Sequence, residues 1–287
     1  GASFLSGDSP PLRNAVPRLG DVRIPVIIVS DSADNPEPAA GVHFFTNELD
    51  SHTFRNYWYV NSHGRYDPRC FVLEESLPDS ISRPADMAEN LPSRIKWERF
   101  AFSLLSHLRN TGKIDTDWLD SSGIAGSPDG RTDGALLLIP GLGGVKILSP
   151  PADSNVEEGE VLFGPVLAAD IKTPAIDILR AFAALMGLCD LERRMCLSLC
   201  SADDGFPIID AYNRTRAGWT EVVRVDGTMK DVLVLPAAAS GKVYMIGRKK
   251  EYFLLENRGA EPGGYDLSID RPGLAVYHVD ESGGDTG

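Results

Sequence analysis

The sequence predicts an α/β protein of the α+β kind, with a mixed sheet in its first part and a β-rich part after it. Two aliphatic runs, residues 22–30 and 135–139, are bounded by glycine, proline or charged residues, which is typical of buried strands. Two longer segments are expected to be helices. In 84–110 apolar residues recur at helical spacing, and in 174–186 they occur on all sides of the helix. Beyond Pro207 the chain changes to short β-rich runs separated by turn residues.

Composition limits the class of protein and its partners. The chain has 287 residues, of which 43% are hydrophobic, and this is enough for a large core. Its 28 basic and 41 acidic residues give a net charge of −13, which repels phosphate backbones and anionic lipid surfaces. No apolar run approaches the roughly 20 residues that cross a bilayer. Neither nucleic acid nor a membrane span is expected.

The first half of the chain is expected to alternate strand and helix. Aromatic residues between positions 44 and 59 recur at helical spacing and predict a helix that stops at Gly64, where glycine can adopt a left-handed cap. The segment 84–110 reads as a helix interrupted near Pro92. The strand at 135–139 leads into a glycine-rich turn, which lacks the Lys-Ser/Thr of a phosphate-binding loop.

The next helix is expected from Pro174 to Met186. Proline suits the first position of a helix, Thr173 is the expected N-cap, and Gly187 is the expected terminator. Because apolar residues surround this helix on all sides, it is predicted to be a core helix.

Strands are expected in the C-terminal third, and the chain is expected to divide into an α/β region, 1–205, and a β-rich region, 206–287, packed on it. The predicted strands lie within five runs: 218–225, 231–235, 242–246, 251–256 and 273–279.

Five short motifs resemble, in order, those of the immune inhibitor A-type metalloprotease family, which is peptidase M6-like and has a zincin fold. They are residues 56–64 (NYWYVNSHG), 129–139 (DGRTDGALLLI), 207–219 (PIIDAYNRTRAGW), 251–258 (EYFLLENR) and 273–280 (GLAVYHVD). The resemblance covers nearly the whole chain. It implies a zincin-like metalloprotease fold, with the helix 174–187 as the former active-site helix, and a secreted or extracellular protein.

The helix lacks the residues that give the family its chemistry. The family carries H-E-x-x-H-x-x-G-x-x-D, in which two histidines one helical turn apart bind zinc and the glutamate polarises a water molecule. Alignment on Gly187 and Asp190 puts Arg180 at the first histidine, Ala181 at the glutamate and Ala184 at the second histidine. Alanine has no donor atom and a guanidinium repels a dication, so zinc and peptidase activity are not expected.

Asp190 is the remaining metal-ligand position, and it offers a partner for the arginine. A buried guanidinium needs an anion, so Arg180 is expected to reach Asp190 or a neighbouring carbonyl and to fill part of the zinc space. The alternative is that Arg180 points to the surface.

Other residues suggest weaker sites. Asp129 and Asp133, with Asp120 as a further candidate, could hold calcium in a turn-rich loop, although an ordinary turn capped by acids fits as well. The segment Asn213-Arg-Thr215 fits a glycosylation acceptor. No other cofactor is predicted.

The four cysteines, Cys70, Cys189, Cys196 and Cys200, form no C-x-x-C pair. They are interpreted either as buried thiols or as containing one disulfide among the last three.

The expected function is therefore binding of a peptide or protein, or a structural role, by a proteolytically inactive pseudoenzyme. The alternative is a peptidase or other hydrolase that uses other residues, for which Cys196 or Cys200 with His278 is the nucleophile pair to consider.

Overall fold

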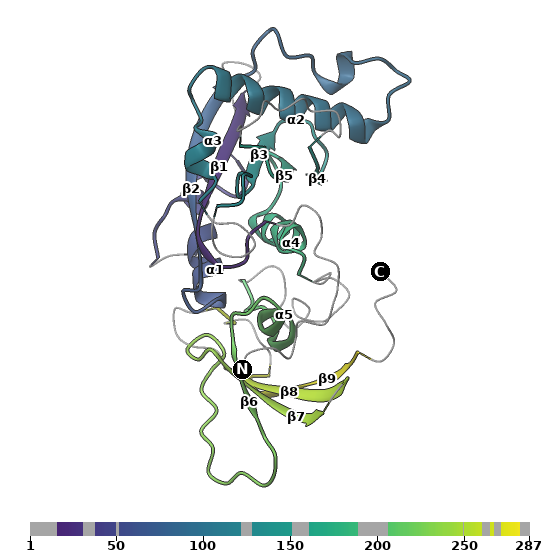
Figure 1. Ribbon diagram of the computed structural model, residues 1–287. Helices are drawn as coiled ribbons and strands as arrows, with labels where there is room; N and C mark the ends of the chain where they lie inside the picture. The colour runs from purple at the N-terminus through teal and green to yellow at the C-terminus, as the bar shows by residue number, and fades with distance from the viewer. Residues whose placement is uncertain are drawn as a thin grey trace. The chain divides into compact units, whose positions relative to one another are not determined.

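The computed structural model in Figure 1 describes residues 16–30, 38–49, 52–121, 128–150, 161–188, 206–248, 250–259, 265–266 and 271–281. Its contacts divide the chain into two units. The larger unit comprises Leu12–Asn56 and Asp67–Gly187, and the smaller comprises Gly1–Pro11, Tyr57–Tyr66 and Leu188–Gly287. The predicted boundary between residues 205 and 206 lies at the end of a stretch outside the described residues and stays a prediction.

The larger unit is built on a five-stranded mixed sheet in the order β2-β1-β3-β5-β4. β1 pairs with β3 and β3 with β5 in parallel, while β4 runs antiparallel to β5. The predicted strands at 22–30 and 135–139 are confirmed as β1 and β3, and the other three were not predicted. The strands are β1 (Gly20–Ser30), β2 (Tyr66–Ser76), β3 (Ala135–Ile139), β4 (Val145–Leu148) and β5 (Val166–Asp170).

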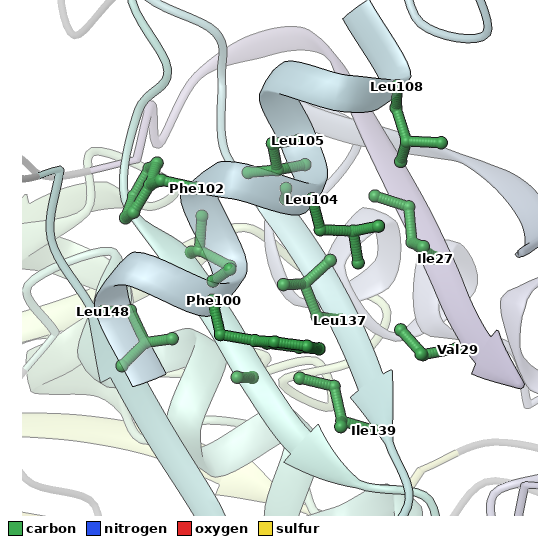
Figure 2. Close-up of a cluster of buried hydrophobic side chains, with 14 of the residues drawn as sticks. Ile27, Val29, Phe100, Phe102, Leu104, Leu105, Leu108, Leu137, Ile139 and Leu148 are labelled. Carbon is green, nitrogen blue, oxygen red and sulfur yellow. The ribbon is translucent and has the colours of Figure 1, made fainter. Parts of the chain in front are cut away.

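Helix α2 (Ser93–Asn110) covers one face of this sheet. The predicted interruption near Pro92 is confirmed, since a short 3-10 helix, η2 (Pro84–Asp86), precedes it and Pro92 is the N-cap of α2. In Figure 2 its apolar stripe packs against residues of β1, β3 and β4, and the same cluster includes Val166 and Ala168 of β5. The helix contributes Phe100, Phe102, Leu104, Leu105 and Leu108, and the strands contribute Ile27, Val29, Leu137, Ile139 and Leu148.

Helix α4 (Ala175–Leu185) lies on the other face. It contacts β4 and β5, and none of its residues belongs to the cluster under α2. Successive strand side chains alternate between faces, so Leu136, Leu138, Leu167 and Ala169 point to the α4 side, where they are fully buried. The unit also contains η1 (Val42–Phe45), α3 (Thr116–Leu119) and the start of α1 (Phe54–Asn61).

The smaller unit contains a four-stranded sheet in the order β6-β7-β8-β9. β6 and β7 are parallel, and the other two pairs are antiparallel. Helix α5 (Ala211–Arg216) covers one face, where Ala211 joins a buried cluster with Val243, Tyr252 and Leu254. The strands are β6 (Glu221–Arg224), β7 (Lys242–Arg248), β8 (Glu251–Arg258) and β9 (Gly273–Asp280).

The predicted strand at 231–235 is wrong. Asp231 has a left-handed backbone (φ 54°), which interrupts an extended chain, and the run does not pair with any described strand. Leu233 is 78% exposed, so its apolar side chain lacks the buried face that makes such a run a strand. The other four predicted runs in this part do contain strands.

The predicted stop of the helix near residue 60 is confirmed. α1 ends at Asn61, and Gly64 has φ 74°, the left-handed conformation expected of a terminating glycine. The same segment, Tyr57–Tyr66, carries the fully buried Trp58 and Tyr66, and both rings contact Trp219 within the smaller unit.

Candidate functional site: an open helix face beside a sheet edge

One face of α4 is open, although the sequence predicted a helix buried on all sides. Asp177, Arg180, Ala181 and Ala184 share this face, because their spacing of three and four residues places them in one row. Ala184 is exposed and the other three are half-buried, whereas Ile178, Leu179, Phe182 and Ala183 are buried. The prediction of a core helix is therefore wrong for this face. Alanine is short and apolar, so it fits a buried or an open position equally well.

The ends of α4 follow from proline and glycine. Pro174 is the N-cap, one residue later than the predicted Thr173, and no side chain caps the first turn. The Thr173 amide is already bonded to the Asp170 carbonyl at 2.8 Å. At the other end Gly187 has φ 70° and donates its amide to the Ala184 carbonyl at 2.9 Å, so the predicted terminator is confirmed.

Arg180 pairs with an acid one turn earlier on its own helix. Its Nη1 donates to Asp177 Oδ1 at 2.9 Å, and its side chain is 28% exposed. Such a pair contributes about 0.2–0.5 kcal/mol. The Arg180 Nε atom is buried without a hydrogen-bond partner in the described part of the chain. The predicted partner, Asp190, lies outside the described residues, so that contact stays a prediction.

The donor atoms on this face are few. Ala181 and Ala184 offer none, the Arg180 guanidinium is a permanent cation, and the Asp177 carboxylate is engaged by that cation. Among the described residues no group of three or more histidine, cysteine or acidic side chains could hold a metal ion. The face offers small apolar contacts and one paired guanidinium.

Strand β4 forms the edge of the sheet next to α4, and α4 contacts it. The Asp170 amide donates to the Gly144 carbonyl at 2.8 Å, which makes residues 144 and 170 a hydrogen-bonded pair of the β4–β5 ladder. Bonded positions alternate in an antiparallel ladder, so Lys146 and Leu148 bond to β5. The backbone groups of Val145 and Ile147 point outward, and no described strand pairs with them.

The side chains of β4 also favour contact with an added segment. Leu148 belongs to the cluster under α2, so Val145 and Ile147 lie on the α4 side by alternation. Ile147 is 40% exposed. A hollow of about 460 Å³ lies beside β4 at the start of α2, and it is lined by Ser93, Arg94, Lys146, Ile147, Leu148 and Ser149. Sequence reasoning missed this edge, although the short VKIL run after a glycine-rich turn was a signal for it.

The acids proposed for calcium cap backbone amides. Asp120 accepts from the amides of Asp129 and Gly130 at 3.0 and 2.8 Å, and Asp129 accepts from that of Arg131 at 3.1 Å. Asp133 is almost fully buried and accepts from the hydroxyl and the amide of Ser121. This is the arrangement of a turn capped by acids. Calcium at Asp129 and Asp133 stays a prediction.

The prediction that Asn213 is a glycosylation acceptor is wrong. Asn213 is fully buried in α5, where its side-chain amide donates to Asp210 Oδ2 at 2.8 Å. An acceptor must lie on an accessible surface, so a sequon inside a packed helix is not one.

Of the residues considered for the alternative hydrolase, only His278 lies in the described part of the chain. His278 is an exposed residue of β9, stacked on Phe253 and 3.1 Å from Glu251 Oε1. Cys189, Cys196 and Cys200 lie outside the described residues. Cys70 is buried, and burial raises the pKa of its thiol, which makes it a poor nucleophile.

Comparison with known proteins adds no relative. A scan against protein-family models finds no match, and a search of curated proteins finds none either. The resemblance to the immune inhibitor A-type family therefore depends on the five motifs alone. None of the helices in the described residues is both long and apolar enough to pass through a membrane.

Proposed function

We propose that this chain is a metalloprotease-like protein without peptidase activity, which binds an extended peptide along β4 and the open face of α4. The observation that carries the proposal is the edge of β4, which pairs with no other described strand, beside a helix face with Arg180 and Ala184 at the two histidine positions of the family motif. An extended peptide can add a strand to such an edge by bonding to the outward backbone groups. A secreted location follows from the family resemblance and is part of the proposal.

Several features support binding without cleavage. The motif order suggests a zincin-like fold, and the mixed sheet, α4 and Gly187 agree with that suggestion at a coarse level. Hydrolysis in that family needs a metal and a general base, and Arg180, Ala181 and Ala184 supply neither. Ala181 and Ala184 on this face are small, so a peptide backbone could approach them closely.

The first experiment asks whether the protein cleaves. Purified protein is assayed for bound zinc by elemental analysis and for digestion of casein and gelatin. We expect less than stoichiometric zinc and no digestion. Stoichiometric zinc with chelator-sensitive cleavage would overturn the proposal. Cleavage that a thiol-modifying reagent blocks would overturn it in favour of the cysteine alternative.

The second experiment tests the edge of β4. Binding of fluorescein-labelled casein and gelatin is measured by fluorescence anisotropy for the wild type and for Ile147→Pro. Proline removes the outward amide of Ile147 but leaves the β4–β5 bonds intact, and edge strands tolerate it. We expect the loss of this amide to weaken binding about tenfold, which corresponds to about 1.4 kcal/mol.

Two controls make this result specific. Ile147→Ala removes the exposed side chain but keeps the amide, and it is expected to bind more tightly than the proline variant. Val276→Pro places proline on the edge of the other sheet and is expected to bind like the wild type. If the wild type binds neither probe, or if Ile147→Pro binds as well as the wild type, strand addition at β4 is wrong.

A further inference from the structure

Strand β9 is an edge strand of the four-stranded sheet in the described part of the chain. It pairs with β8 over eight consecutive residues without a bulge, and its outer edge has no partner strand in the described residues. Proteins usually protect such an edge with lysine, proline, a bulge or a very short strand. Within β9, which reads GLAVYHVD, none of these devices is present.

The hydrogen bonds of β8 identify which backbone groups face outward. The Glu281 amide donates to the Lys250 carbonyl at 2.7 Å, so these two residues form a bonded pair that continues the β8–β9 ladder. By alternation, positions 275, 277 and 279 bond to β8. The backbone groups of Leu274, Val276, His278 and Asp280 therefore point away from the sheet.

The side chains at these positions are apolar and accessible. Leu274 is 56% and Val276 is 58% exposed. They continue a sheet face on which Ile246 and Phe253 are each 42% exposed, and α5 covers the opposite face. Exposed apolar area next to the outward backbone groups of Leu274, Val276 and His278 favours association with another strand.

We propose that a second copy of this chain pairs with β9 edge to edge, in antiparallel orientation about a two-fold axis at Val276. The two four-stranded sheets then join into one continuous sheet. A two-fold interface of this kind uses the same patch on both copies, so every contact occurs twice.

The charges near the ends of β9 select this register. Arg271 lies five residues before Val276 and Glu281 lies five residues after it. Antiparallel pairing centred on Val276 therefore places Arg271 of each copy opposite Glu281 of the other. Each opposite-charge pair is favourable and offsets part of the repulsion between two chains of net charge −13.

The neighbouring registers are less favourable. Pairing centred on Tyr277 places Glu281 opposite Gly273, and pairing centred on His278 places it opposite Ala275. Both registers separate Glu281 from Arg271, so the opposite-charge pairs are lost.

The test is sedimentation velocity of the full chain over a wide range of protein concentration. We expect a reversible monomer–dimer equilibrium for the wild type, and about tenfold weaker association for Val276→Pro. This substitution removes an outward amide and leaves the β8–β9 bonds in place. The control, Ile246→Lys, charges the same exposed face on β7 without touching the edge, and it is expected to dimerise like the wild type.

Several outcomes would overturn the proposal. One is a protein that stays monomeric at every concentration. Another is association that Ile246→Lys abolishes and Val276→Pro leaves intact, because it indicates contact between sheet faces. Circular dichroism and thermal melting of each variant show that it is folded before its association is compared.

A charge exchange tests the register itself. Arg271→Glu and Glu281→Arg should each weaken dimerisation by placing like charges opposite one another, and the double variant should restore it. Glu281 also accepts a hydrogen bond from the Tyr252 hydroxyl at 3.0 Å, so the melting temperature of both variants containing Glu281→Arg is measured alongside. A double variant that associates no better than the single variants contradicts the register.

Discussion

Four charged side chains of the smaller unit neutralise one another away from water. Glu256 lies between two arginines: Arg214 donates to one carboxylate oxygen, and Arg258 lies 3.3 Å from the other. Arg258 also binds both oxygens of Asp266, at 2.8 and 2.7 Å. Burial alone would raise the pKa of Glu256, but the two guanidinium groups and the Tyr277 hydroxyl hold it below its usual value. Glu256 therefore stays ionised and joins the four charges into one network.

Removing the charge of Glu256 should destabilise this unit. In Glu256→Gln the two buried arginines lose part of their neutralising charge, and breaking a buried pair typically costs about 3–5 kcal/mol. Urea denaturation followed by tryptophan fluorescence measures the change, since Trp58 and Trp219 lie in the same unit. The control is Glu251→Gln, whose carboxylate is exposed and which should change stability by no more than about 0.5 kcal/mol. Equal effects of the two variants would show that the network contributes little.

At the scale of elements, the sequence predicts β1 and β3 of the larger sheet, but it misses the interior strand β5 and both edge strands. β1 and β3 are buried on both faces, so they read as continuous aliphatic runs. β2 and β4 lie at the edges of the sheet, and their mixed exposed and buried positions give no such run. The run at 231–235 has the composition of a strand but no partner to pair with.

The candidate site, too, could be predicted from the sequence only in part. The substitutions at Arg180, Ala181 and Ala184 could be read from the sequence, because their meaning depends only on which atoms a side chain carries. Two features could not be read from it: the pairing of Arg180 with Asp177, and the outward backbone of β4. Both depend on which surfaces the tertiary packing leaves open.

The turn after α1 depends on a glycine for two separable reasons. Gly64 has φ 74°, and a Cβ there would lie 3.1 Å from the Tyr59 ring. Gly218, in the same unit, has φ 79° but open space around its Cβ position. Gly218→Ala should therefore cost only the backbone strain of about 1–2 kcal/mol. Gly64→Ala should cost more, because the ring must also move, and thermal melting of the two variants compares them. A smaller loss for Gly64→Ala would mean that the ring adjusts freely.

At the scale of the whole molecule, acid should lower the free energy of unfolding, because some groups bind fewer protons in the folded protein than in the unfolded chain. His63 is the clearest case: burial, and then the charges of Arg214 and Arg65, lower its pKa from 6.5 to about 4. Its Nε2 lies 3.2 Å from Arg214 Nη1, so the neutral ring can accept that hydrogen bond and the protonated ring cannot. Between these two pKa values the unfolded chain binds more protons than the folded one, so stability falls as the pH is lowered from 6.5 to 4.

The variant His63→Asn tests this dependence. His63 has φ 53°, a left-handed conformation that asparagine tolerates, and asparagine does not titrate. We expect the stability of this variant, measured by urea denaturation, to vary less than that of the wild type between pH 6.5 and 4. The pKa values of Glu256 and Asp67 are also lowered in the folded protein, so their contributions to stability fall in acid too. These contributions are the same in the wild type and in His63→Asn, so they cancel when the two proteins are compared. The control His43→Asn changes an exposed histidine and should follow the wild type. Parallel curves for the wild type and His63→Asn would show that this imidazole does not control the acid response.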